Sequence, residues 1–179
     1  MSISKTWGTD PSERKLPYPC DAVVPGAQDE YFRGITVNAS SAVVFRWLCQ
    51  LRAGPYSYDM IDNLGRKSST RLTPGLENLA RGQIFMYGFE LMEFEKDRHI
   101  TLKSRGGSLL IGIIGVSYCL QSRSDHSSRL LVKVSVRYPA GPVGWGMRAL
   151  LPWGDLFMMR KQMMNFKALA EAQARTSAA

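Results

Sequence analysis

Five strand-like segments follow one another at short spacing in the second half of the chain, separated only by turn-forming residues. They span residues 83–87, 89–96, 99–105, 108–121 and 129–138. Because connections this short cannot carry the chain back across a sheet, the strands are expected to pair as antiparallel hairpins. In the last segment apolar residues alternate from Leu130 to Tyr138, which predicts one buried face. Lys133 and Arg137 would lie on the other face, in water.

One strand and two helices are predicted before this series. Residues 31–38 alternate as a strand does, and a helix capped by Asn38 or Ser40 should run from there to about Arg52. A loop that enters a second short helix follows over residues 56–63. Two short helices are therefore expected after the first strand.

The two ends of the chain differ in character. Residues 1–30 are rich in Pro, Asp, Ser and Gly without any periodicity, so we expect an extended arm that lies over the domain. The glycines and prolines of residues 139–153 predict a connection. Beyond it, apolar residues recur at three and four positions from Leu156 to Ala170, which predicts a helix of about 20 residues ending at Arg175.

The chain length and these elements predict an α+β fold with one main domain. The 179 residues compare with a typical domain size of roughly 150. We assign residues 1–30 to the N-terminal arm and residues 31–179 to a single domain.

The net charge of +8 is concentrated in the second half of the chain. Residues 98–179 hold twelve basic and three acidic residues, but the basic ones are spread singly along strands and one helix. A nucleic-acid site more often shows a dense basic block, so we expect a solvated basic face and no nucleic-acid partner.

No pattern in the sequence points to a metal, a cofactor or a membrane span. The three cysteines lie too far apart for a zinc site or a disulfide framework, and no glycine-rich segment has phosphate-loop spacing. The first residues lack the apolar stretch of a signal peptide, and the apolar run 109–116 is too short to cross a bilayer. We therefore expect a cytoplasmic protein.

Tyr58 and Asp59 form the most suggestive catalytic pair. They belong to Tyr56-Ser57-Tyr58-Asp59, which places phenols and a carboxyl group at a predicted helix start. A desolvated Asp59 would have a raised pKa and could act as acid or base, while Tyr58 polarises a carbonyl. Alternatively, Asp59 caps the helix and the tyrosines pack. Arg105, at a strand end, is a further candidate if it points inward.

Three stretches, together with the order of the elements, carry a family resemblance. They are Trp7-Gly8 with Leu16-Pro17 and Val24-Pro25, then residues 33–39 (RGITVNA) with residues 44–51 (VFRWLCQL), and finally residues 158–163 (MMRKQM). The chain resembles the SRPBCC superfamily of START lipid-transfer domains, birch-pollen-allergen-like proteins and polyketide cyclase/dehydrases, in particular an uncharacterised bacterial branch. This resemblance implies a helix-grip fold, in which a curved antiparallel sheet of about six or seven strands wraps around the long C-terminal helix.

The resemblance also implies an apolar cavity between the sheet and that helix. The four methionines of residues 157–166 are flexible and suit a pocket that adapts to its ligand. Alternatively, Met and aromatic residues at this helical spacing belong to an ordinary hydrophobic core. We expect the lining to consist of Trp47, Tyr56, Tyr58, Tyr87, Leu102, Val134, Trp153, Phe157, Met163 and Phe166. Tyr58 or Arg105 would orient the ligand.

The expected function is binding of a hydrophobic small molecule such as a lipid, polyketide or aromatic metabolite, for transport, storage or sequestration. The alternative is a polyketide cyclase/dehydratase-like enzyme in which Asp59, Tyr58 or Arg105 moves protons. A buried titratable group facing the cavity would favour that alternative. A third possibility is transient docking on an anionic membrane through residues 145–153, which would otherwise pack onto the domain. The sequence leaves the oligomeric state open.

Overall fold

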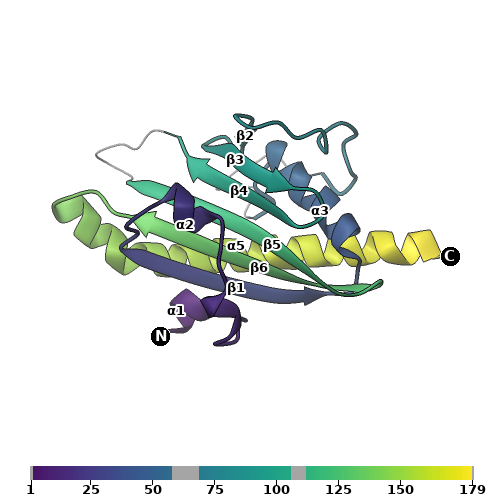
Figure 1. Ribbon diagram of the computed structural model, residues 1–179, viewed down its shortest axis with the longest axis horizontal. Helices are drawn as coiled ribbons and strands as arrows, with labels where there is room; N and C mark the ends of the chain where they lie inside the picture. The colour runs from purple at the N-terminus through teal and green to yellow at the C-terminus, as the bar shows by residue number, and fades with distance from the viewer. Residues whose placement is uncertain (1, 58–68, 106–111, 179) are drawn as a thin grey trace.

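A six-stranded antiparallel sheet with a long helix across one face forms the centre of the molecule (Figure 1), a computed structural model that describes residues 2–57, 69–105 and 112–178. The strands are β1 (Asp29–Val37), β2 (Ile84–Phe85), β3 (Phe89–Glu95), β4 (His99–Ser104), β5 (Ile113–Ser124) and β6 (Ser127–Arg137). Their order across the sheet is β1-β6-β5-β4-β3-β2. The α+β helix-grip architecture expected from the sequence is confirmed.

Consecutive hairpins build the sheet, and β1 is the exception. β5 and β6 form the longest hairpin, in which Ile113 pairs with Arg137. β1 pairs along its whole length with β6, which brings the start of the chain beside its last strand. The edge strand β2 is shorter than the predicted segment 83–87, because Met86 and Tyr87 have positive φ angles of 46° and 59°, which are incompatible with a strand.

The helix after β1 begins where the sequence predicts. α3 (Ser41–Cys49) continues into the 3₁₀ turn η2 (Gln50–Arg52). Ser40 caps α3, since its hydroxyl accepts a hydrogen bond from the backbone N–H of Val43 at 3.4 Å. The second short helix, expected over 56–63, lies outside the described residues from position 58 on.

The C-terminal helix α5 (Pro142–Ala178) has 37 residues and is much longer than predicted. The predicted connection over 139–153 was therefore wrong, because residues 142–153 form about three turns of helix. Pro142 occupies the first helical position, where its missing N–H is not needed. Gly144 serves close packing rather than a turn, since a Cβ there would lie 2.0 Å from the carbonyl oxygen of Pro139.

The N-terminal segment, residues 2–28, covers the sheet face opposite α5 and one sheet edge (Figure 1). It is not extended as predicted but contains the short helices α1 (Ile3–Thr6), η1 (Glu13–Lys15) and α2 (Cys20–Val23). The Cys20 backbone N–H donates to the Ser117 hydroxyl of β5 at 2.8 Å. The segment therefore forms a second layer on the sheet.

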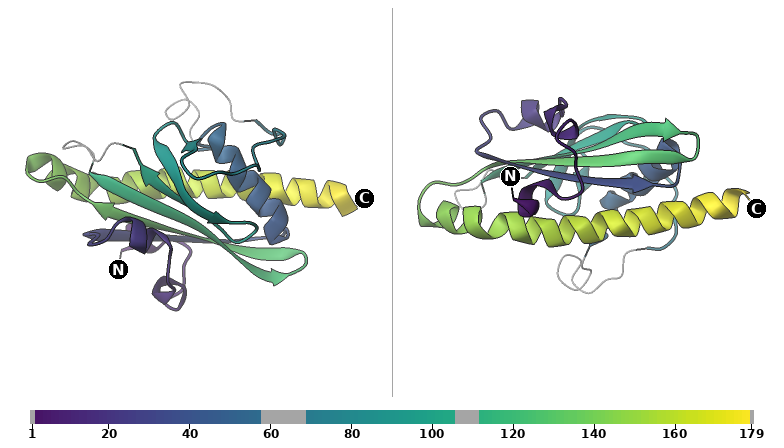
Figure 2. Two further views of the ribbon diagram at one scale, coloured as in Figure 1. Left: turned by 45° about the horizontal axis from the view of Figure 1, so that its top comes forward. Right: turned by 90° about the horizontal axis from the view of Figure 1, so that it is seen from below.

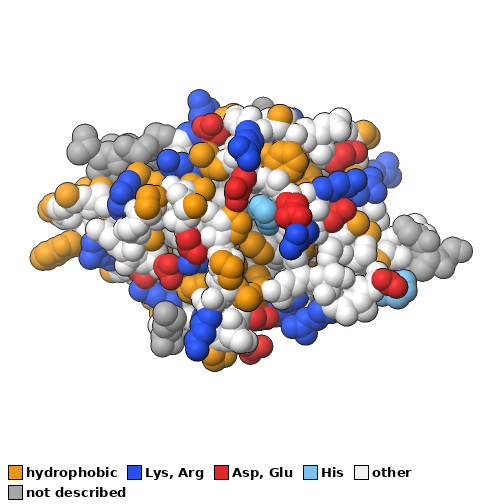
Figure 3. Space-filling view, in the orientation of Figure 1, with side chains coloured by type: hydrophobic (Ala, Val, Ile, Leu, Met, Phe, Trp, Pro, Cys, Tyr) orange, Lys and Arg blue, Asp and Glu red, His pale blue; other side chains and the backbone are white. Residues whose placement is uncertain are grey.

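The prediction that one face of β6 is solvated is confirmed at Arg137, which is exposed. Over the rest of the strand the N-terminal layer overturns it. Lys133 and Arg129 are only 5% and 9% exposed. The Lys133 ammonium lies 2.6 Å from Asp21 and 2.8 Å from Glu30. These buried basic residues are paired with acidic ones, so part of the predicted basic face lies inside the molecule. Where Figure 3 shows this side of the molecule, basic and acidic side chains are interspersed.

Candidate functional site

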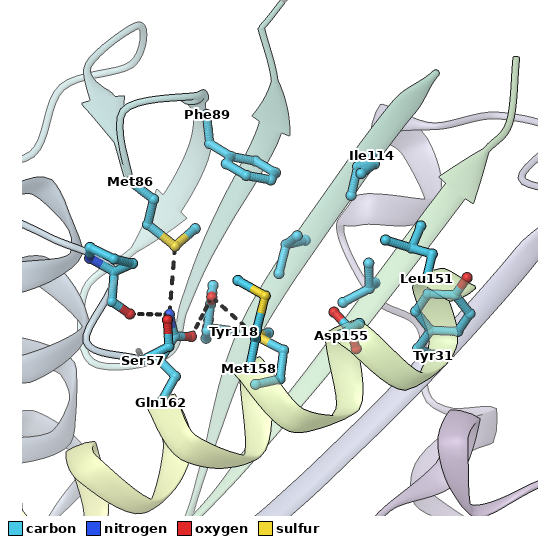
Figure 4. Close-up of a pocket in the computed structure, with 15 residues that line it drawn as sticks. Tyr31, Ser57, Met86, Phe89, Ile114, Tyr118, Leu151, Asp155, Met158 and Gln162 are labelled. Carbon is cyan, nitrogen blue, oxygen red and sulfur yellow. Dashed lines mark hydrogen bonds between the residues drawn. The ribbon is translucent and has the colours of Figure 1, made fainter. Parts of the chain in front are cut away.

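A pocket of about 310 Å³ lies between α5 and the sheet (Figure 4). It is lined by Leu151, Gly154, Asp155, Met158, Met159 and Gln162 of α5, by Tyr31, Val134, Ile114, Val116, Tyr118 and Phe89 of the strands, and by Pro55, Ser57 and Met86. The lining is mostly apolar. Its volume is at the lower end of the roughly 300–1,000 Å³ usual for small-molecule sites.

The periodicities of the helix and of the strand place these side chains around one space. On α5, Leu151, Asp155 and Met158 are separated by four and three residues and so share one face of the helix. On β5, Ile114, Val116 and Tyr118 alternate and therefore project from the same face of the sheet. The pocket is the space left where these two faces do not meet.

Asp155 is the acidic residue of the pocket lining. Its Oδ2 accepts a hydrogen bond of 2.7 Å from the guanidinium of Arg33, a β1 residue that is fully buried. The same guanidinium donates to the carbonyl oxygens of Ser4 and Phe32, at 2.7 and 3.0 Å. Burial raises the pKa of Asp155 to about 6, and Arg33 opposes part of that rise. This carboxyl group therefore titrates near pH 6, well above the usual range of an aspartate.

Tyr118 and Gln162 form the second polar group of the lining. The Tyr118 hydroxyl donates to the Gln162 side-chain oxygen at 2.8 Å. The Gln162 amide in turn donates to the Pro55 carbonyl oxygen at 2.5 Å, which ties the loop after η2 to α5 (Figure 4). Burial raises the pKa of Tyr118 well above its usual value, so this phenol stays protonated. These groups satisfy one another and shape the wall.

Tyr31 lines the pocket, and its hydroxyl belongs to a chain of hydrogen bonds in the wall. Its hydroxyl lies 2.5 Å from the Tyr138 hydroxyl, which itself donates to Asp29 at 3.1 Å. Because Tyr138 uses its proton on Asp29, Tyr31 must donate to the oxygen of Tyr138. Because Tyr31 is fully buried, its hydroxyl belongs to this hydrogen-bonded chain and is not exposed to a ligand.

Of the ten residues predicted from the sequence to line a cavity, Tyr58 lies outside the described residues, and the other nine fall into three groups. Val134 lines the pocket. Trp47, Tyr56, Leu102, Met163 and Phe166 are buried in the core beside it, where the Tyr56 ring lies 6.4 Å from that of Trp47 and 5.4 Å from that of Phe166. Tyr87, Trp153 and Phe157 are 61%, 49% and 57% exposed and do not line it.

Of the three predicted catalytic candidates, the structure describes Arg105 alone. Tyr58 and Asp59 lie outside the described residues. Arg105 is exposed just after β4 and is not part of the lining. Asp155 was not predicted as a site residue. It lies next to the segment 139–153, which was predicted to be a connection. A signal was present, because Asp155 is the only acidic residue between positions 126 and 170 and continues the apolar stripe of the helix.

Neither a metal centre nor a membrane span is found in the part of the chain that the structure describes. Within residues 2–57, 69–105 and 112–178, no three His, Cys, Asp or Glu side chains gather as metal ligands would. None of the helices formed by these residues combines the length and the apolar composition needed to cross a bilayer.

Similarity to known proteins is found at the level of the fold. No protein-family model matches the sequence, and no curated protein shows significant similarity to it. Among solved structures, a hypothetical protein from Helicobacter pylori is 11% identical with a TM-score of 0.55, over 87% of this chain and 95% of that chain. A protein from Thermobifida fusca is 12% identical with a TM-score of 0.49, over 78% of this chain and 94% of that one.

A third similar structure is DynU16, from the dynemicin biosynthetic locus. It is 16% identical with a TM-score of 0.46, over 75% of this chain and 46% of that chain. At such identities the similarity concerns the fold alone. The Helicobacter pylori structure, with its TM-score of 0.55, shows that the chain shares its fold with a bacterial protein of solved structure.

Proposed function

We propose that this protein is an SRPBCC-type binding protein whose pocket holds a hydrophobic small molecule. The observation that carries the proposal is the pocket of about 310 Å³, walled by apolar side chains with the Asp155 carboxylate among them. Burying apolar ligand surface there would contribute roughly 25 cal/mol per Å² to binding. The few polar groups would fix the orientation of the ligand.

The polar groups of the lining favour a ligand that donates hydrogen bonds. The Asp155 carboxylate offers acceptor oxygens, and no Lys, Arg or His is among the described residues that line the pocket. A hydroxyl or a protonated amine would be matched, whereas a ligand carboxylate would meet a like charge at neutral pH. The proposed ligand is therefore a hydrophobic alcohol or amine rather than a fatty acid.

Three probes of equal chain length test this preference. We expect 1-decanol and decylamine to displace a fluorescent apolar dye from the pocket at lower concentration than decanoic acid at pH 7. Below about pH 6 the Asp155 carboxyl is protonated, so the disadvantage of the acid should shrink. Equal displacement by all three probes at both pH values would contradict the assignment. Native mass spectrometry of protein purified from its own host would identify a retained ligand directly.

Two methionines of α5 provide a matched pair for locating the ligand. Met158 lines the pocket and is 40% exposed, whereas Met164 is 46% exposed and does not line it. Met158→Trp should fill the space and weaken probe binding at least about tenfold, with little loss of stability because the site is partly open. Met164→Trp should leave probe binding unchanged. Equal effects of both substitutions would place the ligand elsewhere.

A cyclase/dehydratase-like enzyme is the second candidate, favoured by the titratable carboxyl of Asp155 in the pocket. A group with a pKa of about 6 can accept and return a proton near neutral pH. Asp155→Asn removes the titration and keeps the size of the side chain. Once a substrate is identified, loss of turnover with retained binding would establish the enzyme, and unchanged turnover would exclude Asp155 as its acid or base.

A further inference from the structure

Exposed hydrophobic side chains are concentrated on one helix. Of the twelve large hydrophobic residues that are exposed in the described part of the chain, seven belong to the first two thirds of α5. They are Val143, Trp145, Leu150, Trp153, Phe157, Met158 and Met164, with exposed fractions from 40% to 79%. In Figure 2 the side of α5 turned away from the sheet is not covered by any described element over these turns.

Four of these residues form a continuous stripe, which we call the outer face of α5. Leu150, Trp153, Phe157 and Met164 are separated by three, four and seven residues, so they lie within one narrow sector of the helix. At 3.6 residues per turn, Arg160 and Lys161 border this sector on its two sides. Apolar residues that include a Trp, with basic residues along the margins, form an interfacial amphipathic pattern.

The charge around the outer face has one sign. Arg160 and Lys161, which border the face, are exposed, and neither forms an ion pair with a described acidic residue. The acidic residues of α5 are Asp155, which is bound to Arg33, and Glu171, which is bound to Lys167. The outer face is thus both apolar and positively charged.

We propose that the outer face of α5 docks on the surface of a membrane that contains anionic phospholipids. The apolar side chains would enter the headgroup boundary, and the basic side chains would contact lipid phosphates. Charge complementarity decides against a second copy of this chain as the occupant. Two such faces packed together would bring Arg160 and Lys161 close to the same residues of the other copy, with no acidic partner on the face.

The outer face is also continuous with the pocket. Leu150 is 75% exposed, while its neighbour Leu151 lines the pocket; Phe157 is 57% exposed, while Met158 is both exposed and part of the lining. A protein docked in this way holds the rim of its pocket at the membrane surface. The docking itself does not depend on what the pocket binds.

Vesicle binding by the full chain tests the proposal. We expect co-sedimentation with vesicles of phosphatidylcholine and phosphatidylserine, weaker binding to pure phosphatidylcholine, and loss of binding as salt is raised. The double variant Leu150→Ser/Phe157→Ser should reduce binding by about tenfold or more. The control is Ile3→Ser, which removes a side chain that is 62% exposed on α1 and should change nothing.

A second pair of variants isolates the charge. Arg160→Gln/Lys161→Gln should weaken binding by more than about tenfold, from roughly fivefold for each basic residue at an anionic surface. Lys15→Gln/Lys96→Gln changes the net charge equally, uses exposed residues of other elements and should have a much smaller effect. Equal effects of the two pairs would overturn the assignment to α5.

Two further outcomes would overturn the proposal. One is the absence of binding to any vesicle by protein with a native thermal transition. The other is a dimer in sedimentation velocity that Leu150→Ser/Phe157→Ser converts to a monomer, since the face would then belong to a second copy. Because none of the substituted residues lines the pocket, probe binding by the same variants shows whether the proposed ligand function holds independently.

Discussion

Asp155 lies between the buried guanidinium of Arg33 and an apolar pocket. These surroundings shift the pKa of its carboxyl group. Its pKa is raised from 3.8 to about 6, chiefly by burial. The native state therefore holds this proton more tightly than the unfolded chain does. Through linkage, the contribution of Asp155 to the free energy of unfolding falls as pH rises from about 4 to about 6.

The prediction at this scale compares the wild type with Asp155→Asn as a function of pH. Asn resembles the protonated carboxyl group, so the variant should lack the loss of stability between pH 4 and pH 6 and should be no less stable than the wild type at pH 7. Thermal unfolding at several pH values measures this. The difference in stability between the two proteins removes the pH-dependent contributions of Glu13 and Glu171, whose pKa values are lowered, because both proteins contain these residues. A strongly destabilised variant at pH 7 would mean that the Arg33 ion pair outweighs burial.

At the scale of elements, the N-terminal segment acts as a layer of the fold because its acidic residues meet buried basic residues of the sheet. Glu13 of η1 accepts hydrogen bonds from Arg129 of β6 at 2.8 and 2.9 Å. The side-chain hydrogen bond from Arg129 holds the pKa of Glu13 below its usual value, so its stabilisation is present at neutral pH and is lost in acid.

Glu13→Gln should lower the free energy of unfolding by about 3 kcal/mol, because Arg129 stays buried without its counter-charge. Arg123 provides the matched control, since it approaches the same carboxylate at 3.9 Å but is 53% exposed. Arg123→Gln should cost less than about 0.5 kcal/mol. Denaturant titration of the two variants measures both values, and similar costs would show that burial does not set the strength of this pair.

The elements differ in how far the sequence could predict them. The β5–β6 hairpin and the Ser40 cap of α3 depend on local alternation and on one side-chain bond, and both could be predicted. The first turns of α5 could not, because glycine and proline usually signal a connection. A glycine is needed at position 144 because a Cβ there would clash with the carbonyl oxygen of Pro139, and Pro142 is tolerated because it occupies the first helical position. Both reasons depend on the folded arrangement.

On the scale of the whole molecule, the sheet is covered on both faces, by α5 and by the N-terminal segment (Figure 1). Sequence periodicity could identify the face of β6 that carries Val132, Val134 and Val136, but not the burial of Lys133, since a lysine in an alternating strand normally points to water. The pocket was expected from the family resemblance. The position of Asp155 in its lining depends on the packing of α5 against β1 and was not predicted.

Removing residues 1–24 should therefore abolish the cooperative unfolding transition rather than merely shift it. Arg129 and Lys133 would lose Glu13 and Asp21, and the buried face of β6 would be opened to water. Near-ultraviolet circular dichroism and thermal unfolding measure the loss. Partial recovery on adding a peptide of residues 1–24 would attribute it to this layer, and a native transition in the shortened chain would contradict the prediction.

The pairing of β1 with β6 also sets when the molecule can become complete during synthesis. Glu13 and Arg129 are 116 positions apart, and among the described strands β1 pairs with β6 alone. At roughly 5–20 residues per second, several seconds pass between the emergence of β1 from the ribosome and that of its partner strand. During that interval the apolar side chains of β1 stand exposed, so a nascent chain stalled before β6 is the form of this protein that chaperones should hold most strongly.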